Sequence, residues 1–217
     1  MIQACLFDLD GVIVDTAKYH YLSWQRLAKE LNIDSFDEHH NEQLKGISRA
    51  DSLNYLLKLE NKTLSQQDFE QYMQRKNDWF LEYVAQMNAD EALTGVEDFL
   101  KDIQKQNIRI ALGSASKNAK LILDKVGLTH YFEVLIDGNA VTNAKPNPEV
   151  FLKGAKALGI APQNCIVFED GLAGVQAAQN AKMKVVGIGS TEVLGTADAV
   201  IPNFEQITVQ KMKELLA

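Results

Sequence analysis

The chain has 217 residues, of which 46% are hydrophobic and 24% charged, and its formal net charge at pH 7 is −7. This length can bury a sizeable core, either as one large domain or as a main domain with a modest insertion. The acidic balance argues against a nucleic-acid groove or an anionic membrane surface, because both need clustered Lys and Arg, whereas local sites for small anions remain possible.

The cysteines and the apolar runs bear on where the protein works. Cys5 and Cys165 lie in apolar, strand-like runs, which predicts buried thiols in a reducing compartment rather than a disulfide framework. The sequence displays no signal-like N-terminus and no apolar run of membrane-spanning length. We therefore expect a cytoplasmic protein with no nucleic-acid or membrane partner, and we expect it to act as a monomer.

The first predicted element is a buried strand at residues 2–7, a mostly apolar run that leads into Asp8, Asp10 and Gly11. Residues two apart point the same way from a strand, so both carboxylates should stand together at its carboxyl end, where open α/β sheets place their ligands. Two carboxylates this close raise each other's pKa unless a cation or a shared proton offsets their charge. The pattern predicts a metal, a proton shuttle or both, and the alternative is an Asp-rich turn.

Helical patterns fill the next part of the chain, and nothing in it resembles a strand. Apolar residues at helical spacing predict a first helix over residues 15–31, and the polar stretch 32–41 predicts a loop. Two more helical patterns follow, and Ser65 is a credible N-cap for the second of them. An all-helical block inside an otherwise alternating chain predicts a second domain. The predicted domains are the helical block at residues 16–87 and a core formed by residues 1–15 and 88–217.

From residue 93 onward, helices and strands alternate, which is typical of a parallel sheet covered on both faces. Gly127 and Gly159 are placed to end two of the helices, and Pro148 suits the first position of one. Together with the N-terminal strand, the apolar runs predict about five parallel strands, which fits a doubly wound α/β sheet. The later runs lie at residues 108–112, 134–136, 165–168, 184–187 and 199–201.

Polar side chains follow several of these strands at one edge of the predicted sheet. Carboxylates from two strands can give Mg²⁺ the oxygen ligands it prefers while leaving room for waters and a substrate phosphate. A Ser, a Lys and the N–H groups at the start of the helix near residue 117 can surround the other phosphate oxygens. The residues are Asp8, Asp10, Ser114, Lys145, Glu169 and Asp170, and the four acids are the predicted ligands of one Mg²⁺.

The same residues suit phosphoryl transfer. An Asp directed at a metal-bound phosphorus can act as a nucleophile and form an aspartyl-phosphate, which is the role predicted for Asp8. Asp10 would then be the general acid and base. Each motif alone is weak, because a Ser at a helix start is usually a cap and a Lys-Pro pair usually lies on the surface. Their agreement in order and strand position favours a functional site over a chance collection.

The chain resembles the haloacid dehalogenase superfamily of aspartyl-phosphate enzymes, whose four marks occur here in order. The resemblance covers the whole chain, because the helical block looks like the cap that this superfamily inserts into its core. It implies a cap that hinges near residues 15–16 and 87–93 and closes over the site to exclude water. Asp10 argues against the dehalogenase branch, which has no use for an acid or base there. The four marks are Asp8-Leu9-Asp10-Gly11-Val12, Ser114, Lys145-Pro146 and Glu169-Asp170.

Within the superfamily, the chain resembles the β-phosphoglucomutase family. The resemblance implies a phosphohexomutase that interconverts β-D-glucose 1-phosphate and β-D-glucose 6-phosphate through an aspartyl-phosphate and a bound glucose 1,6-bisphosphate. Such an enzyme needs positions for two phosphates. The matching stretches are Asp15-Thr16-Ala17 with Tyr19-His20, Asn41-Glu42-Gln43-Leu44-Lys45-Gly46, Ser48-Arg49 with Asp51-Ser52, Arg75-Lys76-Asn77-Asp78, and Ala115-Ser116-Lys117-Asn118.

The resemblance also implies roles for single residues. Thr16 and His20, one helical turn apart, would position Asp10 for proton transfer, and Lys76 with Asp15 would support that helix beside the substrate. Outside this context, His20 would be a structural histidine, and Arg49 and Lys117 would be solvated surface charges. The other predicted substrate contacts are Lys45, Gly46 and Ser52 toward the sugar, and Arg49, Ala115, Ser116, Lys117 and Asn118 on the side of the second phosphate.

One position departs from the family pattern. Many relatives have Ser after the Glu-Asp pair, whereas this chain has Gly171, so any hydrogen bond from that hydroxyl is lost. The nearest alternative function is a Mg²⁺-dependent sugar- or polyol-phosphate phosphatase on the same scaffold, in which water instead of a hydroxyl receives the phosphoryl group. A non-catalytic sensor of sugar phosphates is a further alternative, and the intact Asp8 and Asp10 argue against it.

Overall fold

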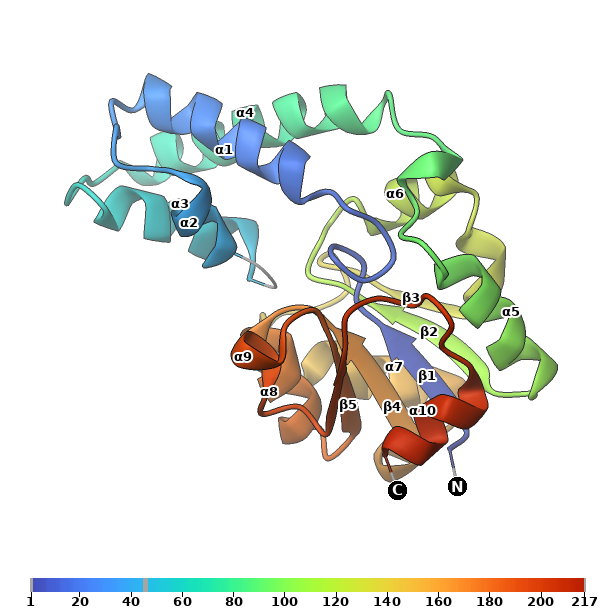
Figure 1. Ribbon diagram of the computed structural model, residues 1–217. Helices are drawn as coiled ribbons and strands as arrows, with labels where there is room; N and C mark the ends of the chain where they lie inside the picture. Colours follow the sequence, from blue (N-terminus) through green and yellow to red (C-terminus); the bar gives the residue numbers. More distant parts are fainter. Residues whose placement is uncertain (1, 45–46, 217) are drawn as a thin grey trace.

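A computed structural model describes residues 2–44 and 47–216 of the chain. Within these residues, six parallel strands form one sheet in the order β3-β2-β1-β4-β5-β6 (Figure 1). The predicted doubly wound α/β core is confirmed. Each of the six apolar runs named from the sequence forms a strand, so the total is one more than the approximate five expected. The strands are β1 (Ala4–Phe7), β2 (Arg109–Gly113), β3 (Val134–Ile136), β4 (Cys165–Glu169), β5 (Lys184–Ile188) and β6 (Ala199–Ile201).

β1 lies in the middle of the sheet, and its side chains are buried on both faces. Cys5 and Phe7 belong to the hydrophobic cluster on one face, and Ala4 and Leu6 belong to the cluster on the other, as the two-residue repeat of a strand requires. The ring of Phe7 stacks on that of Phe168 in β4, with 4.5 Å between the ring centroids. This burial fixes the end of β1 and the direction in which the next residues leave the sheet.

Helices cover both faces of the sheet, as expected for parallel strands. Side chains of α5, α6 and α10 join the cluster that contains Phe7, and those of α7, α8 and α9 join the cluster that contains Leu6. Gly127 and Gly159 end α6 and α7 with φ values of 75° and 70°, which confirms their predicted places. The helices are α5 (Val96–Lys105), α6 (Ala119–Val126), α7 (Glu149–Leu158), α8 (Leu172–Asn180), α9 (Thr191–Leu194) and α10 (Val209–Leu215).

The first four α-helices form the cap, which lies beyond the edge of the sheet where β1 ends (Figure 1). They pack around a separate hydrophobic cluster that includes Trp24, Leu53 and Trp79. The last of them also reaches the core, because Phe80 and Val84 belong to the cluster that contains Phe7. The inserted helical cap is confirmed, and its limits at residues 16 and 87 stay a prediction. The cap helices are α1 (Ala17–Glu30), α2 (Glu38–Glu42), α3 (Arg49–Lys58) and α4 (Gln66–Val84).

The loop predicted over residues 32–41 is wrong at its end, where α2 begins. The Asp37 side chain caps this helix by accepting a hydrogen bond from the backbone N–H of His40, and Phe36 packs into the cap cluster. Its five polar residues carry no helical periodicity, so the pattern could not reveal the helix. Pro148 stands at the N-cap of α7, one residue before its predicted position. Among the described helices, none combines the length and apolarity needed to cross a membrane.

Candidate active site

A cavity of about 1000 Å³ lies between the cap and the edge of the sheet where β1, β2 and β4 end. Thr16 and Glu169 are fully buried beside it, and Lys45 and Gly46 lie outside the described residues. All the other site residues predicted from the sequence line this cavity, so the structure brings them to one place. Those that line the cavity are Asp8, Asp10, His20, Arg49, Ser52, Lys76, Ser114, Ala115, Ser116, Lys117, Asn118, Lys145 and Asp170.

Asp8 continues the line of β1 and is tied to the neighbouring strand, because its backbone N–H donates to the carbonyl of Phe168. The buried Lys145 Nζ donates to Asp8 Oδ1 at 2.7 Å and to Glu169 Oε1 at 2.5 Å. Burial lowers the pKa of Lys145, but the charges and hydrogen bonds of the two carboxylates outweigh burial and raise that pKa above its ordinary value. Lys145 is therefore charged and holds one oxygen of Asp8 in place.

Three acids lie close together at this point, and Lys145 contacts two of them. One carboxylate oxygen each from Asp8, Glu169 and Asp170 lie within 4.8 Å of one another. Burial raises the pKa of Glu169 to about 7, although the charge of Lys145 opposes the shift. Three close carboxylates, two of them buried, suit an added divalent cation, which would relieve their repulsion. These three residues could hold a metal ion.

Two glycines make room for the acids. Gly11, in the turn after β1, has a φ of 77°, and a Cβ at this position would overlap the carboxylate of Asp170. A Cβ on Gly174, in the first turn of α8, would overlap the carboxylate of Glu169. The sequence marked Gly11 as conformationally permissive, but it gave no sign that Gly174 touches the site. Both positions need glycine because of what approaches them, and Gly11 needs it for its backbone as well.

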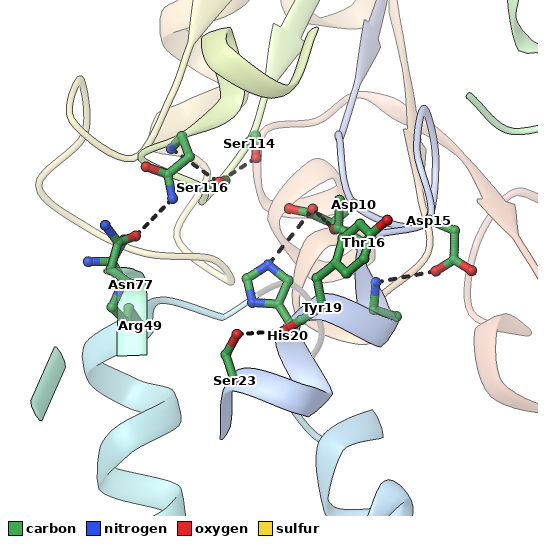
Figure 2. Close-up of polar contacts among 12 residues, drawn as sticks. Asp10, Asp15, Thr16, Tyr19, His20, Ser23, Arg49, Asn77, Ser114 and Ser116 are labelled. Atoms are coloured by element: carbon green, nitrogen blue, oxygen red, sulfur yellow. Dashed lines mark hydrogen bonds and ion pairs between the residues drawn. The ribbon is translucent and has the colours of Figure 1, made fainter. Parts of the chain in front are cut away.

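The carboxylate of Asp10 points to other partners, although the sequence predicts Asp10 as a metal ligand. Thr16 Oγ1 donates to Asp10 Oδ1, and His20 Nε2 lies 3.9 Å from the same oxygen (Figure 2). Burial and the charge of Asp8 raise the pKa of Asp10 to about 6, more than the hydrogen bond from Thr16 lowers it. A carboxyl group with this pKa can accept and donate a proton near neutral pH. The ligand role of Asp10 stays a prediction.

Lys76 supports His20 from the side away from Asp10. Its Nζ lies 2.8 Å from His20 Nδ1, and only 2% of its surface is exposed. The same Nζ lies over the rings of Trp24 and Phe80, at 4.7 and 4.8 Å from their centroids. Burial and the charge of Lys76 lower the pKa of His20 well below its ordinary value, so the imidazole is neutral at pH 7. The tautomer that accepts at Nδ1 leaves the Nε2 hydrogen facing Asp10.

A second polar group lies where the cap meets the turn after β2. Ser114 Oγ accepts from the backbone N–H of Ser116 at 3.0 Å, and Ser116 Oγ accepts from that of Asn118 at 3.2 Å (Figure 2). From the cap, Arg49 Nη2 donates to Asn77 Oδ1 at 2.6 Å, and Asn118 Nδ2 donates to the same oxygen at 2.9 Å. Hydrogen-bond donors from the cap and the core therefore converge in one region of the cavity.

Three further cap and hinge residues have defined places. Ser52 is buried, and its hydroxyl donates to the carbonyl of Ser48 at 3.0 Å. Trp24 packs in the cap cluster and also lines the cavity. Asp15 accepts a hydrogen bond from the backbone N–H of Ala17 at 3.2 Å and so supports the start of α1 (Figure 2). Lys76 contacts the same helix at a different residue, His20.

The sequence assigned no role to Asn77 or Glu149. Asn77 belongs to one of the stretches that match the β-phosphoglucomutase family, and only its place beside Lys76 on α4 pointed to the site. Glu149 begins α7 and accepts hydrogen bonds from the backbone N–H groups of Thr142, at 3.1 Å, and Asn143, at 2.8 Å. It thereby holds the loop that leads into Lys145. An acid in the first turn of a helix is common, so its loop contacts could not be inferred from position alone.

Comparisons with known proteins agree with this geometry. The sequence model of the family described as haloacid dehalogenase-like hydrolase matches residues 5–188. A β-phosphoglucomutase from Bacillus subtilis is 34% identical over 215 residues, which cover 98% of this chain and 95% of the relative. The crystal structure of a β-phosphoglucomutase from Clostridium difficile superposes with a TM-score of 0.95 at 40% identity, covering 100% of this chain and 97% of that one. A phosphorylated carbohydrates phosphatase from Thermotoga maritima is 26% identical over 182 residues, which cover 83% of this chain and 82% of the relative.

Proposed function

The chain belongs to the haloacid dehalogenase-like hydrolase family, and from this membership we propose that it is an enzyme of the β-phosphoglucomutase type. The reaction interconverts β-D-glucose 1-phosphate and β-D-glucose 6-phosphate through an aspartyl-phosphate and glucose 1,6-bisphosphate. One observation carries the proposal: a single cavity holds two polar groups, one around Asp8 and one around Arg49. A mutase needs both, because its intermediate has two phosphates.

Asp8 is the proposed nucleophile. Lys145 holds its Oδ1, which leaves Oδ2 for attack on phosphorus. As the bond from Asp8 to phosphorus forms, the bond between phosphorus and the sugar oxygen breaks, and Lys145 and Ser114 stabilise the charge on the transferring group. In the return step a sugar hydroxyl attacks the aspartyl-phosphate, and the carboxylate of Asp8 is released.

Asp10 is the proposed carrier of the proton. It gives a proton to the sugar oxygen that leaves phosphorus and takes one from the sugar hydroxyl that attacks in the next step. Thr16 and His20 orient its carboxyl group, and both belong to the segment that enters the cap. Closure of the cap around a bound sugar would therefore complete the acid–base group. A site that holds only water would not induce this closure, so the aspartyl-phosphate would be protected from hydrolysis.

Asp8, Glu169 and Asp170 would hold one Mg²⁺, with Asp10 as the fourth predicted ligand. The fit is supported by the burial of Asp8 and Glu169 and by the closeness of the three carboxylates to one another. When bound, Mg²⁺ supplies positive charge that offsets the carboxylates and polarises the phosphoryl oxygens.

The second polar group is the proposed site of the phosphate that is not being transferred. Arg49 would bind it from the cap as a bidentate donor, and the turn before α6 would add backbone N–H donors from the core. Its proposed residues are Arg49, Ala115, Ser116, Lys117 and Asn118. The proposed sugar contacts are Lys45, Gly46 and Ser52, and Lys76 is proposed to support His20 beside the substrate.

A sugar-phosphate phosphatase is the second candidate. It would use the same core residues, and the 26% identical Thermotoga maritima relative is named as a phosphatase of phosphorylated carbohydrates. The two functions differ in the acceptor of the phosphoryl group on Asp8, which is water for a phosphatase and a sugar hydroxyl for a mutase.

One assay separates them. The pure protein is incubated with Mg²⁺, β-glucose 1-phosphate and a trace of glucose 1,6-bisphosphate, and glucose 6-phosphate and free phosphate are measured in parallel. We expect glucose 6-phosphate to form far faster than free phosphate. Release of free phosphate alone would reject the mutase and support the phosphatase.

The proposal extends to the setting of the enzyme. Cys5 and Cys165 are both free and buried, which suits a reducing compartment such as the cytosol. One chain supplies both polar groups of the cavity, which is consistent with a monomer as the working unit.

A further inference from the structure

Asn77 joins the cap to the core at the second polar group. It lies on α4 in the cap, and 8% of its surface is exposed. Its Oδ1 accepts from Arg49 Nη2 at 2.6 Å and from Asn118 Nδ2 at 2.9 Å. Arg49 belongs to the cap and Asn118 to the core, so one oxygen bridges both. In Figure 2, Asn77 and Arg49 lie together, with Ser116 and Ser114 on the core side.

The chemistry of the partners fixes the orientation of the Asn77 amide. A guanidinium can only donate, so Asn77 must turn its carbonyl oxygen toward Arg49. The same oxygen faces Asn118, which must therefore present its NH₂ group. Asn77 thus holds two donors in a fork that points at a single oxygen. This is the arrangement that an oxygen of a phosphate would also require.

A neutral acceptor is important at this position. An amide oxygen orders the guanidinium of Arg49 without cancelling its charge, so that the positive charge stays available to an anion. A carboxylate in the same place would form an ion pair with Arg49 and repel a phosphate. The residue type therefore favours anion binding by the two donors that it holds.

The position of Asn77 along α4 connects the two ends of the cavity. The preceding residue, Lys76, contacts His20, and the other ring nitrogen of His20 lies 3.9 Å from Asp10 Oδ1. Hydrogen bonds from Lys18 and Tyr19 to Glu91 also join α1 of the cap to the core, and they lie where the chain passes between the two parts. The contact made by Asn77 instead lies in the middle of α4, against the turn before α6.

We propose that Asn77 is a positioning residue for the phosphate that is not being transferred: its carbonyl oxygen holds Arg49 and Asn118 in the geometry that binds this phosphate. Asn77 thereby sets the preference for substrates with a second phosphate over small monoesters. The inference rests on the proposed mutase function, and its test includes a measurement that does not require mutase activity.

The test compares Asn77→Ala and Asn77→Asp with Gln74→Ala, an exposed position on the same helix whose side chain contacts Asp78. Each protein hydrolyses a small aryl phosphate, and glucose 1,6-bisphosphate is added as a competitive inhibitor. We expect Asn77→Ala to raise the inhibition constant by about tenfold or more, since hydrogen bonds to charged groups are involved. Asn77→Ala should lower the rate of aryl phosphate hydrolysis much less than it weakens bisphosphate binding, and Gln74→Ala should leave both quantities within about twofold of wild type, the range of neutral surface changes.

Asn77→Asp separates positioning from packing. Asp has nearly the same shape, so a purely structural role predicts wild-type binding, whereas our proposal predicts an inhibition constant raised at least as far as by Asn77→Ala. In an Arg49→Ala background, Asn77→Ala should add little further loss, because the two residues act together. Full additivity, or equal losses on the aryl phosphate and the bisphosphate, would overturn the proposal. If the wild-type protein itself does not bind the bisphosphate, the mutase function fails instead.

Discussion

Asp8 and Asp10 leave the same strand end, yet their surroundings differ. Asp8 shares the ammonium of Lys145 with Glu169, which fixes one of its oxygens. Asp10 receives a hydrogen bond from Thr16, and burial beside Asp8 raises its pKa to about 6. Two carboxylates in different environments can take different roles, one as nucleophile and the other as acid and base. The residues around each carboxylate therefore determine which of the two roles it can take.

Substitution of Asp10 by Asn tests the acid–base role. The amide cannot carry the proton, so we expect kcat for glucose 6-phosphate formation to fall by about 10²–10⁴-fold. The matched control is Asp15→Asn, an exposed acid nearby that contacts the backbone of Ala17 and whose amide could still accept that hydrogen bond. Near-normal turnover of the Asp10→Asn variant in a coupled assay would show that another group moves the proton.

Turns and helix starts place the charges of the site. The turn at Gly11 brings Asp170 toward the end of β1, and the first residue of α7, Glu149, holds the loop before Lys145. Buried apolar residues such as Leu9 and Val12 anchor the turn at Gly11, whereas backbone geometry and single hydrogen bonds set the direction of the charged groups. Changes within one turn should therefore alter the site without disturbing the sheet.

Substitution of Gly11 by Ala should weaken magnesium binding. The new Cβ would overlap the carboxylate of Asp170 and displace it from Asp8 and Glu169. We expect the Mg²⁺ concentration for half-maximal activity to rise by about tenfold, as for other residues that orient metal ligands. Gly127→Ala is the control, because Gly127 has a similar φ of 75° and nothing within 4 Å of a new Cβ. A normal Mg²⁺ titration for Gly11→Ala would refute the role given to this turn.

Substitution of Glu149 by Gln should destabilise the protein in a pH-dependent way. Its hydrogen bonds, first of all from Lys153 and then from the backbone of Asn143 and Thr142, lower its pKa from 4.5 to about 2. A depressed pKa in the folded state adds stability above pH 4.5, and this stability is lost as the pH falls toward 2. The difference in unfolding free energy between wild type and Glu149→Gln should therefore be constant near neutrality and shrink with acid.

Urea unfolding at a series of pH values measures this difference, and Glu214→Gln, on the remote helix α10, serves as the control. A Glu149→Gln difference that stays unchanged between pH 5 and pH 2.5, about the window set by the two pKa values, would contradict the assignment. Because the loop leads into Lys145, kcat should fall along with the loss of stability at neutral pH.

The cap and the core share one helix across the whole molecule. α4 begins in the cap cluster and ends in the core cluster, where Phe80 and Val84 are buried. The ring of Phe80 also lies 4.3 Å from that of His20, measured between centroids. The packing that attaches the cap to the core therefore also supports His20 beside Asp10, the proposed acid–base group.

Truncation of Phe80 to Ala should loosen this attachment. Removal of a fully buried ring lowers the unfolding free energy by about 3–5 kcal/mol, and we also expect a lower kcat because His20 loses its neighbour. Phe69→Ala, in the first turns of α4, removes a partly buried ring that packs only against the cap cluster and should cost less. Denaturant unfolding that finds Phe69→Ala the more damaging change would reject this view of the junction.

The order of the chain made much of the architecture predictable. Apolar runs that end in Asp8, Ser114 and Glu169 predicted strands whose carboxyl ends meet, and the sheet brings them together. Ser65 was correctly expected to cap α4, because its hydroxyl and the N–H of Asp68 are close in sequence. Local signals of this kind need no knowledge of the rest of the fold.

Features that depend on docking between distant segments could not be predicted. Asn77 meets Asn118 only because the cap lies over the core, and no pattern in either segment reports this contact. The burial of Lys76 runs against the usual preference of lysine for water and becomes understandable only with His20 and the rings around it. The direction of the Asp10 carboxylate likewise depends on Thr16, which lies across the turn.

The central place of β1 has a consequence for biosynthesis. Ala4 of this strand pairs with Arg109 on one side and Cys165 on the other. β1 precedes both neighbours in the chain, so during synthesis it must wait for about 105 further residues before β2 exists and for about 161 before β4 exists, with its apolar residues uncovered in the meantime. A half-made chain has no paired strand beneath Asp8 and no Lys145 or Glu169 beside it, so it cannot consume sugar phosphates before synthesis is nearly complete.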